Sequence, residues 1–392
     1  MLCKIDKAID FSFIHDLVKD LYCNDNGRPA LDPTLLFKLL FLGYLYGVRS
    51  ERQLIRDVQI NVAYRWFLGL NLTDKVPDAS TLSQNRRRRF NASEVYQQIF
   101  DEIVLQAMCK KLVSGKTLYT DSTHLKANAN KNKNKWIKVR AASSSRDYLD
   151  ALDQAVEEDR LAHGKNPLSP RSSEPETREI KQSTTDPDSG YMVRDGKPKG
   201  FFYLDRQAER FGFAIRSVGL DAGYFTAGIC KGLEERQIYG VIGYRRPTHR
   251  KGYFYKREYH YDAEQDRYTC PEGAVLIYKT TDRKGYRHYR SDPDRCLSCP
   301  QRERCTRNAK REKTLTRHVW EDSKERIGQH CLSSGGQLIY QRRKETVERS
   351  FADAKELHGY RYARFRVLER MKGQCLLAAA AQNIKKIALL TV

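Results

Sequence analysis

The chain has 392 residues and a mass of 45.6 kDa, which is enough for two or three domains that each bury a core. Hydrophobic residues make up 40% and charged residues 31% of it, a balance that excludes a membrane-embedded or wholly disordered protein. Lys and Arg number 71 against 49 Asp and Glu, so the formal net charge is +22. This excess favours a polyanionic partner, and nucleic acid is the first candidate.

The N-terminus and the cysteines favour a cytoplasmic protein. Charged residues interrupt every apolar run in MLCKIDKAIDFSF, so a secretory signal is not expected. The longest apolar stretch, 35–48, contains Lys38 and is shorter than the roughly 18 residues that cross a membrane. Ten cysteines without an export signal fit a reducing compartment and include candidate metal ligands. We therefore expect a cytoplasmic protein with no membrane partner.

Residues 1–113 are predicted to form an all-α, DNA-binding domain. Pro33 stands at a first helical turn, and apolar residues follow at helical spacing until Gly47. The run 50–53, Ser-Glu-Arg-Gln, has the form of a capping box and opens a second helix over 54–66. Ser80 can cap a third helix, and a fourth spans 94–112.

Four consecutive arginines on the third predicted helix are candidates for contact with a DNA backbone: Arg86, Arg87, Arg88 and Arg89. The helices before them resemble a helix-turn-helix arrangement. The alternative is a solvated helix face. We favour DNA contact because of the net positive charge of the chain.

The pattern changes near Lys116, and residues 114–244 are predicted to form the first part of an α/β core. A short strand over 117–121 ends in an acid. The basic, Pro-rich segment 126–198 follows, with one helix expected over 147–161. Two further β runs, 200–204 and 214–220, precede a helix over 225–236 and a strand over 238–244, an order that implies a parallel strand pair with a crossover.

Residues 245–333 form a basic insertion rich in Tyr and Cys, with hairpin signals at Gly252, Gly273 and Gly285. Its four cysteines have the spacing C-x25-C-x2-C-x5-C and are candidate zinc ligands: Cys270, Cys296, Cys299 and Cys305. Cys270 joins the other three only if a hairpin returns to them. Four reduced thiols and an iron–sulfur cluster are the alternatives. Residues 334–392 are helical to the end.

Three acids stand at comparable places: Asp121 and Asp221 each end a strand, and Glu348 lies in the helical region after the insertion. Carboxylates on rigid elements suit Mg²⁺, which prefers hard oxygen ligands. Two such ions can activate an attacking oxygen and stabilise a leaving one in phosphodiester displacement. Because the chain has 49 acids, spacing alone also fits chance pairs of strand-end carboxylates.

The segments KTLYTDSTHLKANANK, VGLDAGYF and RRKETVERSFADAKELHGYRYARFR follow a helical domain in this order. Together they resemble the DDE transposases of bacterial insertion sequences, over almost the whole chain. The resemblance implies a ribonuclease-H-like core in which two Asp and one late Glu bind two Mg²⁺ ions. Asp121, Asp221 and Glu348 match those positions.

The resemblance extends to the family's Tyr-Arg-Glu-Lys signature. Glu348 and Lys355 have its E-x6-K spacing, which favours Glu348 over its rival Glu345 as the third acid. Tyr340 and Arg343 complete the signature, although Arg343 stands one residue further from the Glu than usual. Lys355 would face a phosphate beside the metals, the alternative being a charge pair within the helix. Further candidate DNA contacts are Arg343, Arg349 and Arg364.

The leading function is Mg²⁺-dependent DNA cleavage and strand transfer at the terminal inverted repeats of an insertion sequence, by a homodimer when both ends are bound. The alternatives are an inactive DNA-binding derivative that represses transposition and a metal nuclease without strand transfer. One departure bears on this choice. The strand after 200–204 begins so soon that one core strand and one core helix are expected to be missing near Leu204 to Arg206, which predicts an exposed sheet edge, poor solubility and weak transposition.

Overall fold

The computed structural model describes residues 1–22, 31–91, 93–120, 123–130, 132–140, 146–169, 177–192, 200–205, 214–244 and 251–392. The chain divides into two compact units. Unit 1 comprises Met1–Val139, Arg178–Ala214 and Arg342–Val392, and unit 2 comprises Arg140–Thr177 and Ile215–Gln341. Within the described ranges, no helix is long and apolar enough to cross a membrane.

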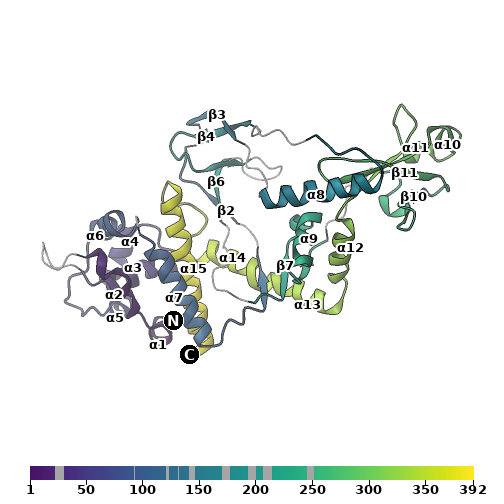
Figure 1. Cartoon of the computed structure of the whole chain (residues 1–392). Coiled ribbons are helices and arrows are strands. Elements are labelled where there is room, and N and C mark those ends of the chain that lie inside the picture. The colour runs from purple at the N-terminus through teal and green to yellow at the C-terminus, as the bar shows by residue number, and fades with distance from the viewer. Residues whose placement is uncertain are drawn as a thin grey trace. The chain divides into compact units, whose positions relative to one another are not determined.

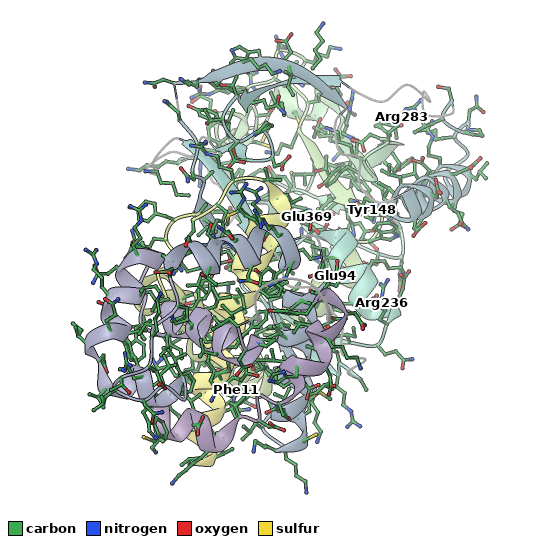
Figure 2. The ribbon with its side chains drawn as sticks, turned by 90° about the vertical axis from the view of Figure 1, so that its left-hand side faces the viewer. Phe11, Glu94, Tyr148, Arg236, Arg283 and Glu369 are labelled. Atoms are coloured by element: carbon green, nitrogen blue, oxygen red, sulfur yellow. The ribbon has the colours of Figure 1, made fainter. Side chains whose placement is uncertain are left out.

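The N-terminal part of unit 1 is a bundle of helices around an apolar core. Its elements are α1 (Leu2–Ala8), α2 (Phe13–Val18), η1 (Lys19–Leu21), α3 (Pro33–Leu45), α4 (Glu51–Ile60), α5 (Val62–Phe67), α6 (Ala79–Asn85), η2 (Arg86–Phe90) and α7 (Val95–Cys109). Ile99 and Ile103 are fully buried on one face of α7, as the spacing of its apolar residues predicts. Phe11 lies among these helices (Figure 2), with its ring centroid 6.1 Å from those of Phe41 and Phe67.

The predicted helix starts are confirmed only in part. The Ser50 hydroxyl accepts a hydrogen bond from the Gln53 backbone N–H at 3.3 Å, but the Gln53 side chain donates to Asp57 instead of returning to Ser50. The capping box is therefore half formed. The predicted helix over 54–66 is divided at Asn61, which caps α5 with its side chain. Ser80 lies inside α6 and is not its cap.

The C-terminal segment packs onto this bundle. It contains η5 (Lys344–Glu348), α14 (Arg349–Leu357) and α15 (Leu368–Thr391), whereas the preceding α13 (Ser334–Arg343) belongs to unit 2 up to Gln341. The prediction of helix through to the end is wrong between α14 and α15, where Tyr362 forms a parallel bridge with Lys126. Yellow in Figure 1, α15 lies along α7 and also contacts α1 and α3. Its buried face shares one apolar core with the N-terminal helices.

A three-stranded antiparallel sheet in unit 1 holds the predicted second core strand. The predicted strand over 117–121 is present as β1 (Thr117–Tyr119), and β2 (Thr123–Lys126) follows it. β2 pairs with β6 (Gly200–Asp205), and β6 pairs on its other side with β5 (Gly190–Met192). β3 (Asn134–Arg140) and β4 (Thr177–Ser183) form a separate two-stranded sheet.

The segment predicted to be shortened lies between β6 and β7 (Ser217–Leu220). Arg206 and the rest of 206–213 are outside the described residues, so the missing strand and helix stay a prediction. The expectation of an unpaired edge on the second strand is wrong for residues 200–202, because β5 covers that edge. β5 precedes β6 in the chain, whereas the prediction concerned only the segment that follows β6.

Unit 2 contains the predicted strand–helix–strand arrangement. β7, η3 (Ala222–Tyr224), α9 (Ala227–Glu235) and β8 (Tyr239–Ile242) follow one another, and β7 and β8 are parallel from Ser217↔Tyr239 to Leu220↔Ile242. α12 (Glu321–His330) packs on α9 and β8. The predicted parallel pair with a helical crossover is confirmed.

The basic insertion is a five-stranded antiparallel sheet with a core rich in tyrosine. Its strands are β9 (His260–Asp262), β10 (Arg267–Thr269), β11 (Val275–Thr281), β12 (Tyr286–Ser291) and β13 (Thr314–His318). Gly273 and Gly285 form the predicted hairpin turns, with φ angles of 78° and 81°. No strand flanks Gly252 within the described 251–259, so that predicted hairpin is wrong.

Shorter helices complete unit 2. η4 (Lys256–Glu258) precedes β9, and α10 (Pro293–Leu297) and α11 (Arg302–Cys305) connect β12 to β13. α8 (Arg146–Ala162) matches the predicted helix over 147–161 and packs on β11. Tyr148 of α8, labelled in Figure 2, makes an edge contact with Trp320, and the two ring centroids are 5.9 Å apart.

Candidate active site and nucleic-acid contacts

Glu348 is the last residue of η5, a single turn of π-helix that leads into α14. A π turn contains one residue more than an α turn, so side chains five positions apart lie on the same face. Arg343 Nη1 donates a hydrogen bond to Glu348 Oε1 across this interval. The extra residue that separates Arg343 from Glu348 in the sequence is therefore taken up by the π turn, and the pair remains together.

Arg343 and Glu348 differ sharply in burial. The Arg343 side chain is 4% exposed, whereas that of Glu348 is 46% exposed. The Arg343 guanidinium therefore holds the Glu348 carboxylate from the protein interior and is not presented at the surface. Glu345 is exposed on the π turn, and within the described part of the chain it forms no ion pair. Among the described residues, a buried cation holds Glu348 but not its rival Glu345.

The helix behind Glu348 is fixed to the bundle of unit 1. The Gln382 side-chain amide in α15 donates to the Ser350 carbonyl at 2.8 Å, which ties the first turn of α14 to α15. At the other end, His358 Nδ1 lies 2.9 Å from the Tyr44 carbonyl oxygen. Burial lowers the pKa of His358, so its ring is neutral near pH 7. These contacts make the helix that follows Glu348 part of a rigid scaffold.

Lys355 lies in α14, seven residues beyond Glu348, and is half-buried. Because α14 is regular α-helix from Arg349 onward, seven residues correspond to two turns and nearly the same face. The local helix therefore has the form that the predicted role of Lys355 requires.

Asp221 follows β7 directly, as predicted, and begins η3 in unit 2. Its Oδ1 atom accepts the Ala222 backbone N–H at 2.8 Å, which fixes the orientation of the half-buried carboxylate. Nearby in the same unit, the Gly243 N–H donates to the Leu220 carbonyl at 3.1 Å. The Tyr340 side chain lies so close to Gly243 that a Cβ atom there would clash with it.

Asp121 lies outside the described residues, but the strand that follows it is described. In β2, the Lys126 N–H donates to the Arg361 carbonyl at 3.3 Å, and the Ala363 N–H donates to the Lys126 carbonyl at 2.8 Å. The strand that follows Asp121 is thus bonded to the segment just after α14, the helix that begins directly after Glu348. Two segments of the predicted triad, more than 200 residues apart in sequence, meet within unit 1.

The predicted zinc site is not formed. Within the described residues, which do not include Asp121, no group of three or more His, Cys, Asp or Glu side chains is placed to hold a metal ion. The β10–β11 hairpin does bring Cys270 to the other three cysteines, and all four line one cavity of about 220 Å³. Two of the thiols instead have hydroxyl partners, since Cys296 Sγ lies 3.1 Å from Ser291 Oγ and Cys305 Sγ lies 3.1 Å from Tyr259 Oη.

The four consecutive arginines do not form one exposed row. Arg86 pairs with Glu51, and Arg89 lies over an aromatic ring, 4.3 Å from its centroid. Both are half-buried, whereas Arg87 and Arg88 are exposed. Because η2 is a π turn, the spacing that predicts a single helix face does not apply. Only the middle two arginines are free of these internal contacts.

The other candidate DNA contacts also differ from one another. Arg349 is 75% exposed and lies 4.0 Å from Asp353 in the next turn, a weak surface pair. Arg364 is half-buried, with its guanidinium 4.4 Å from the centroid of the Tyr44 ring. Sequence reasoning missed Trp136 in β3, which is 67% exposed between the exposed Lys135 and Lys138. An aromatic residue among lysines was the signal that could have identified it.

Two family models match the chain. A transposase domain (DUF772) matches residues 1–88, and a transposase DDE domain matches residues 269–388, so together they span more than half of it. Glu348 and Lys355 lie inside the second match, while Asp121 and Asp221 lie between the two. No curated protein and no solved structure matches the chain.

These matches define the class of the protein as a transposase, an enzyme class that moves DNA segments. It has a helical N-terminal domain followed by a DDE domain. The chain belongs to the DDE transposases of insertion sequences. Its DDE domain implies a ribonuclease-H-like core of mixed helices and strands, in agreement with the fold class predicted from the sequence.

Proposed function

We propose that this transposase cleaves DNA at the ends of its own insertion sequence and joins the freed 3′-hydroxyl groups to target DNA. Water attacks a phosphodiester and the bond to the 3′ oxygen breaks. That oxygen then attacks a target phosphodiester and displaces a new 3′ oxygen, so no covalent protein intermediate is needed. The observation that carries the proposal is the pairing of Glu348 with the buried Arg343 across a π turn in the DDE domain.

The acids assigned to the reaction are Asp121, Asp221 and Glu348. Asp221 and Glu348 each use one carboxylate oxygen locally, and their other oxygens, Oδ2 and Oε2, accept no hydrogen bond from the described residues. Free carboxylate oxygens are the donor chemistry that Mg²⁺ prefers, so these residues fit the metal that the family implies. When bound, two Mg²⁺ ions supply charge stabilisation at the attacking and leaving oxygens.

The residues around the acids have separate tasks in this proposal. Arg343 is a positioning residue that orients Glu348 through a charged hydrogen bond. Lys355 supplies a positive charge for a phosphate on the same face of α14, and the exposed Arg87, Arg88 and Arg349 contact DNA backbone. We place the reaction in the cytoplasm, with a homodimer holding both terminal repeats.

The test is cleavage of labelled duplex DNA that carries the element ends, with Mg²⁺ present. Asp121→Ala, Asp221→Ala and Glu348→Ala should each abolish cleavage and leave DNA affinity equal or stronger, because an acidic side chain repels phosphate when no metal neutralises it. Glu345→Ala is the matched control and should cleave as wild type. Cleavage that survives Glu348→Ala and is lost in Glu345→Ala would overturn the assignment of the third acid.

The products separate the alternatives. Joined strand-transfer products support the transposase, cleavage without joining supports a metal nuclease, and DNA binding without cleavage supports an inactive repressor. The repressor has one observation in its favour, since only 11 residues separate the end of β6 from the start of β7. In that case, inserting a family-like strand and helix between Leu204 and Arg206 should restore joining.

A further inference from the structure

Unit 1 contains a cavity of about 720 Å³ between the N-terminal helices and the segment that runs from Arg364 into α15. This volume falls in the range of about 300–1,000 Å³ that is typical of ligand sites. Charged residues in its lining are mainly basic, with two acids, Glu51 and Asp78, against five arginines: Arg49, Arg52, Arg86, Arg364 and Arg370. Glu51 pairs with Arg86, so the cavity retains a clear excess of positive charge.

Arg364 is a half-buried cation that forms no ion pair with any described residue, and two of its nitrogen atoms are fully buried. Its Nε and Nη2 atoms are inaccessible to water and have no hydrogen-bond partner in the described part of the chain. The backbone around it is fixed, because its N–H donates to Gln374 Oε1 at 2.8 Å and Gln374, 1% exposed, donates in turn to the Tyr362 carbonyl at 3.2 Å. Burying unpaired donors of a charged group is costly, and an anionic ligand would remove that cost.

A second unpartnered donor lines the same cavity. Tyr96 is buried, with 7% of the residue exposed. Its hydroxyl has no hydrogen-bond partner among the described residues. Its ring is held against α15, where a Cβ atom at Gly373 would lie 2.8 Å from it. Burial raises the pKa of Tyr96, so the hydroxyl keeps its proton and can donate. The unpartnered donors of Arg364 and Tyr96 together favour a ligand that accepts hydrogen bonds and carries negative charge.

We infer that this cavity binds a phosphate group of a DNA strand. A guanidinium fork matches the oxygens of a phosphate in two parallel hydrogen bonds. The exposed Arg49, Arg52 and Arg370 at the same cavity provide a positive approach from solvent. A free nucleotide offers the same phosphate chemistry, and we favour DNA because the inference rests on the proposed function of a DNA transposase with a net charge of +22.

The test uses the full chain and three variants. Arg364→Met removes the charge and keeps the stem of the side chain, and Tyr96→Phe removes only the hydroxyl. Tyr22→Phe is the matched control, because it removes another buried hydroxyl that lies outside the cavity. Affinities for a duplex oligonucleotide with the element ends and for deoxyadenosine monophosphate are measured by fluorescence anisotropy and calorimetry, and folding by thermal unfolding.

Arg364→Met should weaken duplex binding about tenfold or more, and Tyr96→Phe by several fold, while Tyr22→Phe binds as wild type. The slope of log K against log salt should fall by about 0.9 in Arg364→Met and stay constant in Tyr96→Phe, because only the first change removes a cation from phosphate. Tyr96→Phe should leave the melting temperature unchanged, since it removes a buried hydroxyl that lacks a hydrogen-bond partner in the described part of the chain. Arg364→Met also removes the contact with the Tyr44 ring, so its melting temperature should fall by no more than a few degrees.

The outcomes distinguish this inference from the proposed function. A wild-type chain that binds no duplex refutes the function and the inference together. If the wild-type chain binds duplex and both variants bind it as tightly as wild type, only the inference of a phosphate site in this cavity is refuted. Loss of nucleotide binding with unchanged duplex binding overturns the choice of DNA. If Arg364→Met does not fold, the Arg364 charge is needed for folding. The affinity of Tyr96→Phe for duplex DNA then decides whether the cavity binds phosphate.

Discussion

Removing the charge of Glu348 should destabilise the folded protein, apart from any effect on catalysis. In Glu348→Gln, the 4% exposed Arg343 side chain loses its charged hydrogen bond to Glu348. A hydrogen bond to a charged group is worth about 1.5–3 kcal/mol. Because the Glu348 side chain is 46% exposed, solvent screens part of this, and we expect a loss of about 1–2 kcal/mol in the free energy of unfolding.

Urea unfolding followed by circular dichroism measures this difference, with constant slope m as the check that the unfolding transition is unchanged. Glu345→Gln is the matched control, since it removes an exposed carboxylate from the same π turn and should change stability by less than about 0.5 kcal/mol. The single variant Arg343→Met and the double variant Arg343→Met/Glu348→Gln complete a mutant cycle that isolates the coupling between the two side chains. Equal effects of Glu348→Gln and Glu345→Gln, or zero coupling, would refute the reasoning.

Three further changes test the scaffold. Ile103→Ala, at a fully buried position of α7, should cost about 2–5 kcal/mol in urea unfolding. Gly47→Ala should cost more than Gly69→Ala, because both glycines have a positive φ (64° and 73°) but only a Cβ at Gly47 would lie 2.8 Å from a backbone oxygen; equal melting temperatures would contradict this. A hydrogen bond from Arg326 lowers the pKa of Glu234 from 4.5 to about 2, so its stabilising effect is complete above pH 4.5 and lost as pH falls toward 2. The stability difference between wild type and Glu234→Gln should therefore shrink over that range.

Local patterns were sufficient for many single elements. The start of α3 at Pro33, the buried face of α7 and the extent of α8 follow from helical periodicity and terminal residues alone. The parallel pair of β7 and β8 follows equally from the order of strand, helix and strand. Sequence failed where one local signal competed with another, as at Asn61, where a capping side chain divides a helix that looks continuous.

The candidate site shows the same division. Asp221 at the end of a strand and the seven-residue interval from Glu348 to Lys355 were accessible from the sequence, since both depend on near neighbours in the chain. The spacing of Arg343 looked wrong by one residue until the π turn was known, because α-helical geometry is assumed whenever helix faces are read from a sequence. The four arginines at 86–89 looked equivalent for the same reason.

The sequence by itself determined the class of this protein, its positive charge and most of its helices, because these depend on composition, ordered motifs and contacts between near neighbours. Tertiary structure alone decided that α15 completes the core of the N-terminal helices, and that β2 bonds to the segment beyond α14. It also decided that Tyr96 and Arg364, more than 250 residues apart, line one cavity with their donors unpartnered. Burial and pairing of this kind arise between residues distant in the chain, so no local pattern contains them.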